Sequence, residues 1–327
     1  METPNFDTNA LWNLSAGDFL EVSQKVFKFQ STHNPIYKQW IELSKQDNPT
    51  IIGVHQIPFL PISFFKTHPV FIGEQPTTLF ESSGTTQDVV SKHWVADTNL
   101  YEQSFLNCFN IFYGNIAEYC IIGLLPSYLE RKHSSLVYMV DKLIKLSGHG
   151  QRGFYINEFK SLNHVLINLE AQKQKTILLG VSFALIDFMD AYPQQLNYTT
   201  IIETGGMKGR KIELPKSELH ASLMKGFGVA NIHAEYGMTE LLSQAYSLGE
   251  GLFRCPPWMK VLVGEEEDPG VLKNSGKGVL HIIDLANVYS CAFIATEDLG
   301  IVYEDGSFEV LGRMDNSDRR GCSLLVI

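Results

Sequence analysis

Strand-like runs alternate with helix-like stretches between about residues 51 and 250, and this alternation constrains the fold more than any other feature. The runs 119–125, 176–181 and 199–203 are short and rich in apolar or β-branched residues, as buried strands are. This pattern predicts an α/β fold with a largely parallel sheet. We expect an α/β core with a helical N-terminal segment over residues 1–250, and a β-rich subdomain over 251–327.

Two helices of the core are predicted from their periodicity. Asp97 can cap the first, which ends at Gly114, and a second closes at Gly148. The apolar faces that identify them are Tyr101, Phe105, Cys108, Phe109 and Phe112 in the first, and Leu136, Val140, Leu143 and Ile144 in the second. We interpret both helices as scaffold.

Charge and cysteine usage exclude several classes of protein. Lys and Arg number 26 against 36 Asp and Glu, a net charge of −10, which argues against a nucleic-acid partner. The five cysteines have no metal-ligand spacing, which favours reduced thiols in a cytoplasm. No apolar run approaches the roughly 20 residues that a membrane helix needs. We therefore expect a cytoplasmic protein without a membrane span.

A hydroxyl-rich loop follows an apparent strand that ends near residue 81. Glycine lets the backbone approach an anion closely, and hydroxyls with free N–H groups can hold phosphate oxygens. No Gly-Lys-Ser/Thr follows, so this is not the common P-loop. The alternative is an ordinary Ser/Thr-rich turn. The candidate phosphate-binding residues are Ser82, Ser83, Gly84, Thr85 and Thr86.

A glycine cluster follows the strand expected over 199–203. Gly205 and Gly206 would allow a planar ring or a carboxylate to lie against the backbone, and Lys208, Arg210 and Lys211 supply positive potential. The alternative is a mobile basic surface loop.

A third cluster combines Tyr236, Thr239 and Glu240. An aromatic ring can stack on a base, and a carboxylate can bind Mg²⁺. The alternative is a strand-to-helix junction with Thr239 as its N-cap. Two weaker signals lie further along the chain. Asp298 precedes a Gly turn and could accept both hydroxyls of a ribose. Arg313 lies in a Gly-Arg-Met-Asp run.

The order of these motifs resembles that of the adenylate-forming enzymes, which include acyl-CoA synthetases, luciferases and peptide-synthetase adenylation domains. The resemblance spans about residues 60 to 320 and implies ATP and Mg²⁺ as cofactors. It implies that residues 82–86 hold the ATP phosphates, that Thr239 helps to hold the α-phosphate, and that Glu240 binds Mg²⁺.

The same resemblance implies that Tyr236 packs on adenine and that Asp298 and Arg313 bind the ribose. Asp315 corresponds to the hinge before a small C-terminal lid domain. Only 12 residues follow Asp315. The implied fold is therefore the large domain of an adenylate-forming synthetase, with a β-rich C-terminal subdomain and without the usual lid.

Within this superfamily the chain is most similar to the acyl-protein synthetases of bacterial fatty-acid reductase complexes. The runs that carry this likeness are 57–66, 126–131 and 320–322. The family implies that a fatty acid is activated as an acyl adenylate and passed to Cys322, and that a reductase or another acyl-acceptor protein is the partner. Arg319 and Arg320 could favour the Cys322 thiolate.

Three alternatives to this interpretation stay open. Cys322 could be a buried structural cysteine. The chain could be an acyl- or aryl-CoA ligase of the phenylacetate type, with coenzyme A as the acceptor. It could also be a non-catalytic nucleotide-binding subunit.

Overall fold

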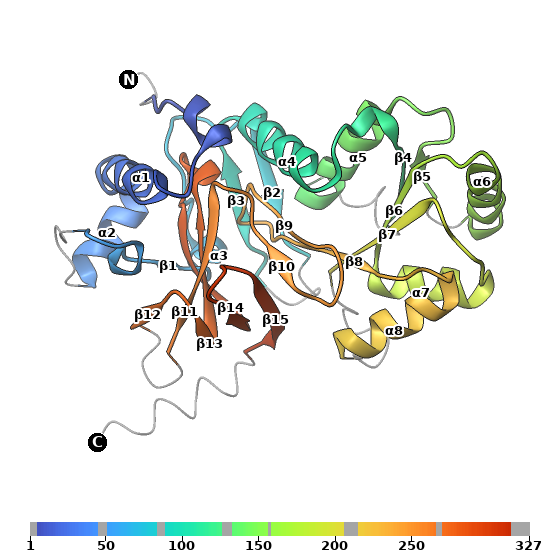
Figure 1. Cartoon of the computed structure of the whole chain (residues 1–327). Coiled ribbons are helices and arrows are strands. Elements are labelled where there is room, and N and C mark those ends of the chain that lie inside the picture. The colour runs from blue at the N-terminus through green and yellow to red at the C-terminus, as the bar shows by residue number, and fades with distance from the viewer. Residues whose placement is uncertain are drawn as a thin grey trace.

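The computed structural model describes residues 5–44, 51–83, 89–125, 133–155, 158–205, 215–265 and 270–314. Its framework is one sheet of thirteen strands with helices packed around it (Figure 1), so the predicted α/β class is confirmed. Along the sheet the strands follow the order β12-β11-β13-β14-β15-β10-β9-β8-β7-β6-β4-β5, and β1 pairs with β14.

One half of the sheet is parallel and has helices on both faces. Its strands are β4 (Cys120–Leu124), β5 (Gly153–Phe154), β6 (Thr176–Val181), β7 (Thr199–Thr204) and β8 (His233–Tyr236). Its helices are α4 (Thr98–Tyr113), α5 (Ser135–Ser147), α6 (Phe159–Ala171), α7 (Ser182–Ala191) and α8 (Lys216–Phe227). Successive side chains of β7 point to opposite faces of the sheet. Ile202 therefore packs with α4 and α5, whereas Ile201 packs with α6, α7 and α8.

The predicted caps explain where two of these helices begin and end. The Asp97 carboxylate accepts the backbone N–H of Asn99 at 2.9 Å, and Gly114 ends α4 with a φ of 81°. At the end of α5, Gly148 takes the left-handed conformation with a φ of 67°. Local signals in the sequence therefore predicted both helices correctly.

The other half of the sheet is antiparallel. Its strands are β9 (Ala245–Ser247), β10 (Phe253–Arg254), β11 (Met259–Gly264), β12 (Leu272–Lys273), β13 (Gly276–Asp284), β14 (Phe293–Val302) and β15 (Phe308–Arg313). Short β1 (Leu60–Pro61) joins β14 in parallel, and β2 (Thr78–Glu81) pairs with β3 (Lys92–Val95) in a separate hairpin. The predicted boundary near residue 250 falls between β9 and β10, which pair with each other, and the division into domains stays a prediction.

The N-terminal helices pack against the antiparallel half (Figure 1). These are α1 (Phe19–His33), α2 (Pro35–Leu43) and the single turn α3 (Phe64–Thr67). From α1, the Gln30 amide donates to the carbonyls of Asn287 and Val288, at 2.9 and 2.8 Å, and its oxygen accepts the N–H of Ala292. Just beyond α1, Asn34 donates to the carbonyl of Ser290. The first and last thirds of the chain are therefore joined by buried hydrogen bonds.

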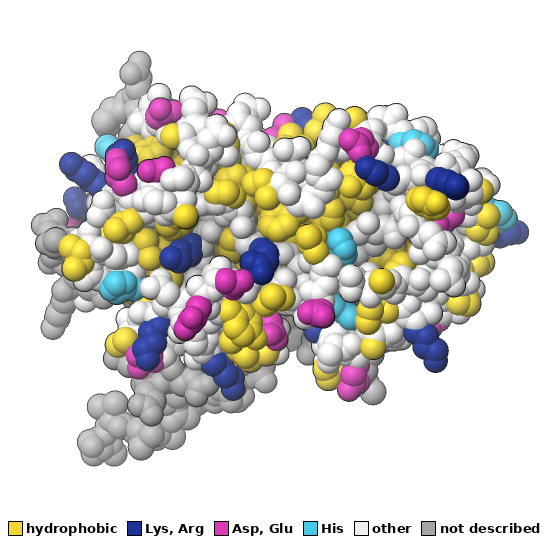
Figure 2. Space-filling view, viewed as in Figure 1, with side chains coloured by type: hydrophobic (Ala, Val, Ile, Leu, Met, Phe, Trp, Pro, Cys, Tyr) yellow, Lys and Arg dark blue, Asp and Glu magenta, His cyan; other side chains and the backbone are white. Residues whose placement is uncertain are grey.

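The described surface carries no concentrated positive charge on the face shown in Figure 2, where Lys and Arg side chains are scattered singly. Among the described helices, none combines the length and the apolar character that crossing a membrane requires.

Candidate active site

Three residues predicted from separate motifs meet beside the junction of the two half-sheets. The Tyr236 hydroxyl at the end of β8 donates to Asp298 Oδ2 of β14 at 2.7 Å. Asp298 pairs in register with Arg313 of β15, whose Nε lies 3.8 Å from Asp298 Oδ1. The Tyr236 ring packs against Phe253 and Phe308. The structure thus brings together a ring, a carboxylate and a cation separated by up to 77 residues in sequence.

The Asp298 carboxylate is partly buried, and its surroundings act on its charge in opposite directions. Burial raises its pKa above the ordinary value, and the nearby Glu297 raises it further. The Tyr236 hydroxyl and the Arg313 guanidinium oppose this rise. Such a carboxylate can accept hydrogen bonds from hydroxyl groups of a ligand, provided that the ligand displaces or shares the Tyr236 hydroxyl.

Thr239 and Glu240 lie in an irregular segment after β8, residues 237–244, which we call the motif loop. No helix begins here, so the alternative of Thr239 as a helix N-cap is wrong. Glu240 is only 5% exposed, and burial raises the pKa of its carboxylate. The Ser91 hydroxyl hydrogen-bonds this carboxylate, and the charges of Arg313 and Asp298 also act on it. The motif loop and the Tyr236–Asp298–Arg313 cluster therefore belong to one electrostatic site.

Ser82, at the start of the predicted hydroxyl-rich loop, is hydrogen-bonded to Ser91, which directly precedes β3. The backbone N–H of Ser82 donates to the Ser91 carbonyl at 3.0 Å, and that of Ser91 donates to Ser82 Oγ at 2.9 Å. Ser83 is also described. Because Ser91 contacts Glu240, the loop is anchored at the motif loop. The remaining predicted residues lie outside the described part of the chain: Gly84, Thr85, Thr86, Gly206, Lys208, Arg210, Lys211, Asp315, Arg319, Arg320 and Cys322.

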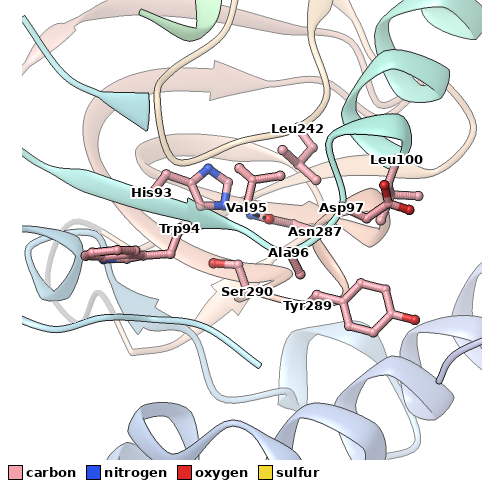
Figure 3. A pocket seen from close by; sticks show the side chains of 10 residues that line it. All are labelled: His93, Trp94, Val95, Ala96, Asp97, Leu100, Leu242, Asn287, Tyr289 and Ser290. Atoms are coloured by element: carbon pink, nitrogen blue, oxygen red, sulfur yellow. Dashed lines mark hydrogen bonds between the residues drawn. The ribbon is translucent and has the colours of Figure 1, made fainter. Parts of the chain in front are cut away.

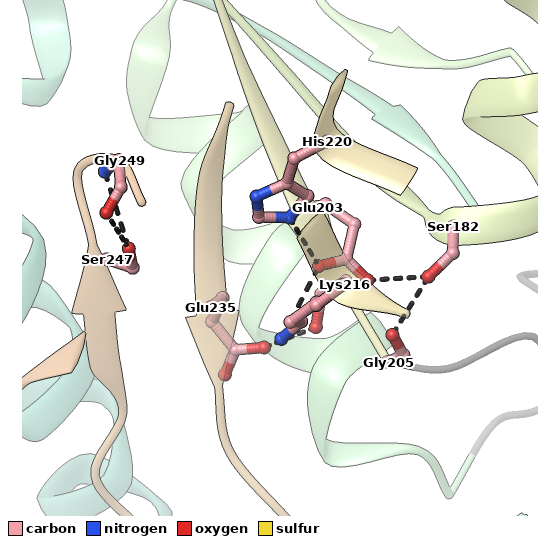
Figure 4. Close-up of polar contacts among 9 residues, drawn as sticks. Ser182, Glu203, Gly205, Lys216, His220, Glu235, Ser247 and Gly249 are labelled. Atoms are coloured by element: carbon pink, nitrogen blue, oxygen red, sulfur yellow. Dashed lines mark hydrogen bonds and ion pairs between the residues drawn. The ribbon is translucent and has the colours of Figure 1, made fainter. Parts of the chain in front are cut away.

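Gly205 ends β7 with a φ of 71°, and its carbonyl accepts a hydrogen bond from Ser182 Oγ at 2.9 Å. The same hydroxyl donates to Glu203 Oε1 at 2.5 Å. The other carboxylate oxygen of Glu203 lies 3.7 Å from Lys216 Nζ and 3.6 Å from His220 Nε2 (Figure 4). This buried polar cluster was not predicted, although Glu203 interrupts an apolar strand.

Sequence reasoning also missed the side chains that hold the motif loop in place, namely His93, Asp284 and Asn287. Figure 3 shows His93 and Asn287 next to each other beside a small cavity that Leu242 of the motif loop also lines. The signal that could have found them is modest, since His93 and Asp284 are polar residues inside or at the end of apolar strands.

Glu240 fits a magnesium ion that is held mainly by substrate phosphates. Mg²⁺ commonly takes one or two carboxylates from the protein and completes its shell with phosphate oxygens and water. The described residues hold no group of three or more His, Cys, Asp or Glu side chains that could bind a metal alone. A single carboxylate next to a hydroxyl-rich loop agrees with the first arrangement.

Solved structures of other proteins share this architecture. A 2-hydroxyisobutyryl-CoA ligase, crystallised in an open conformation with 2-HIB-AMP and CoA, superposes with a TM-score of 0.66 at 10% identity, over 92% of this chain and 70% of the ligase. ATP-bound MatB from Rhodopseudomonas palustris gives a TM-score of 0.55 at 18% identity, over 72% of this chain and 47% of MatB. The chain has the adenylate-forming ligase fold. The match to MatB covers 47% of MatB, so this chain spans less than half of that protein.

A sequence relationship accompanies the adenylate-forming fold. The long-chain-fatty-acid–luciferin-component ligase of Aliivibrio fischeri is 22% identical over 338 residues, which cover 92% of this chain and 85% of the ligase. No protein-family model matches the chain. The chain is therefore a relative of this fatty-acid ligase, and the resemblance seen in its motifs is confirmed.

Proposed function

We propose that the chain activates a carboxylic acid with ATP and transfers the acyl group to the thiol of Cys322. A long-chain fatty acid is the substrate class that we favour, because the related ligase of Aliivibrio fischeri is named for it. The observation that carries the proposal is the convergence of Tyr236, Asp298 and Arg313 beside the loop that holds Glu240.

In the first step, a carboxylate oxygen of the acid attacks the α-phosphorus of ATP. The bond from that phosphorus to the bridging oxygen breaks, and pyrophosphate leaves with the electron pair. In the second step, the Cys322 thiolate attacks the acyl carbon of the adenylate, and AMP leaves. The thiol proton passes to solvent, and the product is an acyl thioester.

The described residues have distinct parts in the first step. Asp298 accepts the ribose hydroxyls, and the charge of Arg313 opposes the rise that burial causes in the Asp298 pKa. Tyr236 borders the base, and Thr239 contacts the α-phosphate. Glu240 would hold Mg²⁺, which supplies positive charge against the phosphoryl oxygens. Ser82 and Ser83 begin the proposed phosphate loop, and its other residues, Gly84, Thr85 and Thr86, lie outside the described part of the chain. The motifs and the convergence of Tyr236, Asp298 and Arg313 support these roles.

The other four cysteines support Cys322 as the acceptor, because a thiol must ionise to attack an acyl adenylate. Burial raises the pKa of Cys120 and of Cys291 to about 12. Burial also raises the pKa values of Cys108 and Cys255 above that of an ordinary thiol. Each of these four thiols is therefore held in its unreactive neutral form, and Cys322 is the only remaining cysteine in the sequence.

The test is to incubate the protein with ATP, Mg²⁺ and fatty acids of graded chain length, and to measure pyrophosphate exchange and intact mass. We expect the parent to gain one acyl group that hydroxylamine removes. Cys322→Ser should keep pyrophosphate exchange and lose the acyl adduct, and the matched control Cys255→Ser should keep both.

Other results would point elsewhere. Acylation that persists in Cys322→Ser contradicts the proposed acceptor. Exchange without acylation, together with pyrophosphate release that requires coenzyme A, favours a coenzyme A ligase. Absence of exchange with every acid contradicts the activity itself. If acylation is found, a reductase or an acyl-carrier protein is the partner that we expect to consume the thioester.

A further inference from the structure

Side chains from two distant segments fix the backbone of the motif loop. The Thr239 carbonyl lies 2.8 Å from His93 Nδ1, and the Glu240 carbonyl accepts from Asn287 Nδ2 at 2.7 Å. Asp284 Oδ2 accepts the N–H groups of Leu242 and Ser243 at 2.8 and 2.9 Å. Two consecutive carbonyls and two consecutive N–H groups of the loop are thus bound to side chains outside it, so these contacts specify its path.

The hydrogen bonds of Asn287 determine which way its amide faces. Nδ2 donates both to the Glu240 carbonyl and to the Cys291 carbonyl, the second at 3.0 Å. These two acceptors use both amide hydrogens. The amide oxygen therefore faces His93, whose Nε2 lies 3.1 Å from it.

His93 consequently lies between two oxygens that can only accept. A neutral imidazole carries one N–H and can satisfy one of them. His93 has no exposed surface, and burial lowers its pKa to about 4, so the ring is neutral near pH 7. The shorter contact, to Thr239, takes the proton on Nδ1, and the Nε2 lone pair then faces the Asn287 oxygen.

The segment that leads into β3 also reaches the side chain of Glu240. Ser91, two residues before His93, hydrogen-bonds the Glu240 carboxylate and ties the end of the hydroxyl-rich loop to Ser82. The segment 91–93 therefore contacts the backbone of the motif loop, the Glu240 carboxylate and Ser82 at the start of the hydroxyl-rich loop.

We propose that His93, Asn287 and Asp284 are positioning residues that form a clamp on the motif loop and so set the places of Thr239 and Glu240 during adenylation. The proposal rests on the proposed function. The clamp touches no part of the base or ribose site at Tyr236, Asp298 and Arg313 in the contacts described. Its loss should therefore lower the rate of adenylation more than the affinity for ATP.

Two substitutions of His93 separate positioning from simple packing. In His93→Asn the amide nitrogen takes the place of Nδ1 and can still donate to the Thr239 carbonyl. In His93→Gln the amide nitrogen takes the place of Nε2, and the bond to Thr239 is lost. We expect kcat for pyrophosphate exchange to stay within about threefold of the parent in His93→Asn, and to fall by at least about tenfold in His93→Gln. The KM for ATP, and its Kd by calorimetry, should change by less than about twofold.

The matched control is His281→Asn. His281 is also a buried histidine whose pKa is lowered by burial, but its Nδ1 contacts the Val279 carbonyl of its own strand. This variant should keep the exchange rate of the parent. Asn287→Asp is an independent check, because a carboxylate cannot donate to the Glu240 carbonyl, and it should lower kcat as His93→Gln does.

Each outcome is decisive. Equal losses of kcat and of melting temperature in His93→Asn and His93→Gln would show that His93 only packs, and would overturn the clamp. Parent-like kcat in His93→Gln would overturn it as well. In both cases an active parent leaves the proposed function intact, whereas a parent without exchange on any acid overturns both proposals.

Discussion

On the two faces of the sheet at β7 and β8, the pKa of a buried carboxylate is shifted in opposite directions. Glu203 pairs with Ala234 and Thr204 pairs with Glu235, so the side chains of Glu203 and Glu235 leave opposite faces. They are 0% and 7% exposed. The pKa of Glu203 is nevertheless below its ordinary value, whereas that of Glu235 is raised to about 7.

The difference comes from the partners that each face supplies. Burial alone would raise both pKa values, but on the α8 face His220, Lys216 and the Ser182 hydroxyl together reverse the effect for Glu203. At 3.6 Å the His220 contact is electrostatic, not a hydrogen bond. On the α4 face, Glu235 lies among aromatic side chains and accepts a hydrogen bond from the Thr204 hydroxyl. This bond and the charge of Lys216 lower the Glu235 pKa by less than burial raises it. Partners, and not depth, decide whether a buried carboxylate keeps its charge.

The largest expected effect is the pH dependence that Glu235 imposes on stability. Between pH 4.5 and about 7, the unfolded chain has lost the Glu235 proton while the folded chain keeps it, so stability falls as pH rises through this range. The gap corresponds to roughly 3 kcal/mol. We expect Glu235→Gln to match the parent near pH 4.5 and to exceed it by up to about 3 kcal/mol above pH 7.

Urea unfolding of parent and variant at several pH values measures this difference. The control is Glu218→Gln, which changes an exposed carboxylate on α8 and should leave the pH profile unaltered. A difference between Glu235→Gln and the parent that stays constant from pH 5 to pH 8 would contradict the assigned shift.

The next effect has the opposite sign. Glu203→Gln removes the charge that faces Lys216 and His220, and we expect it to destabilise the protein at pH 7 by about 2 kcal/mol. The expected loss of stability is smaller than for a fully buried ion pair, because the Lys216 side chain is 35% exposed. Since the folded pKa of Glu203 is lowered, its contribution is present above the ordinary value of 4.5 and is lost as pH falls through the folded pKa.

Thermal and urea unfolding at pH 7 and at low pH test this expectation. The loss should shrink in acid, while the gain from Glu235→Gln should grow in base. If both variants shifted stability in the same direction at pH 7, the contrast between the two faces would not hold.

The smallest effect concerns the space that Gly237 leaves for Glu235. A Cβ at position 237 would lie against Glu235 Oε1, well inside van der Waals contact. We expect Gly237→Ala to cost about 1.5 kcal/mol. In a Glu235→Ala background the same change should cost about 1 kcal/mol less, which a double-mutant cycle of unfolding free energies would measure. Strict additivity would show that the two positions do not compete for space.

The fold was predictable where the sequence signal is local. Asp97 and Gly114 delimit α4 through caps within the helix itself, and the expected run 176–181 coincides with β6. Buried strands and capped helices are specified by residues a few positions apart, so a local sequence pattern predicts them.

The candidate site was predictable only in its motif residues. Tyr236, Asp298 and Arg313 were expected to act together and do meet. His93 and Asn287 were missed because their contacts to the motif loop span 146 and 47 residues. The alternative of a helix after Thr239 failed for a related reason, since Asp284 binds two N–H groups of the loop from 41 and 42 residues away. Such contacts form only when the chain folds, so they produce no periodic pattern in the sequence.

The buried bonds between α1 and residues 287–292 have a consequence for the order in which the protein is made. Gln30 leaves the ribosome more than 250 residues before the backbone groups that it binds. During synthesis at about 5 to 20 residues per second, that interval lasts on the order of tens of seconds. The apolar side of α1 must therefore remain without its final partner until residues 287–292 have been made. A nascent chain that has not reached residues 287–292 lacks both these bonds and the Asn287 side chain, so the clamp on the motif loop should form only after these residues are made.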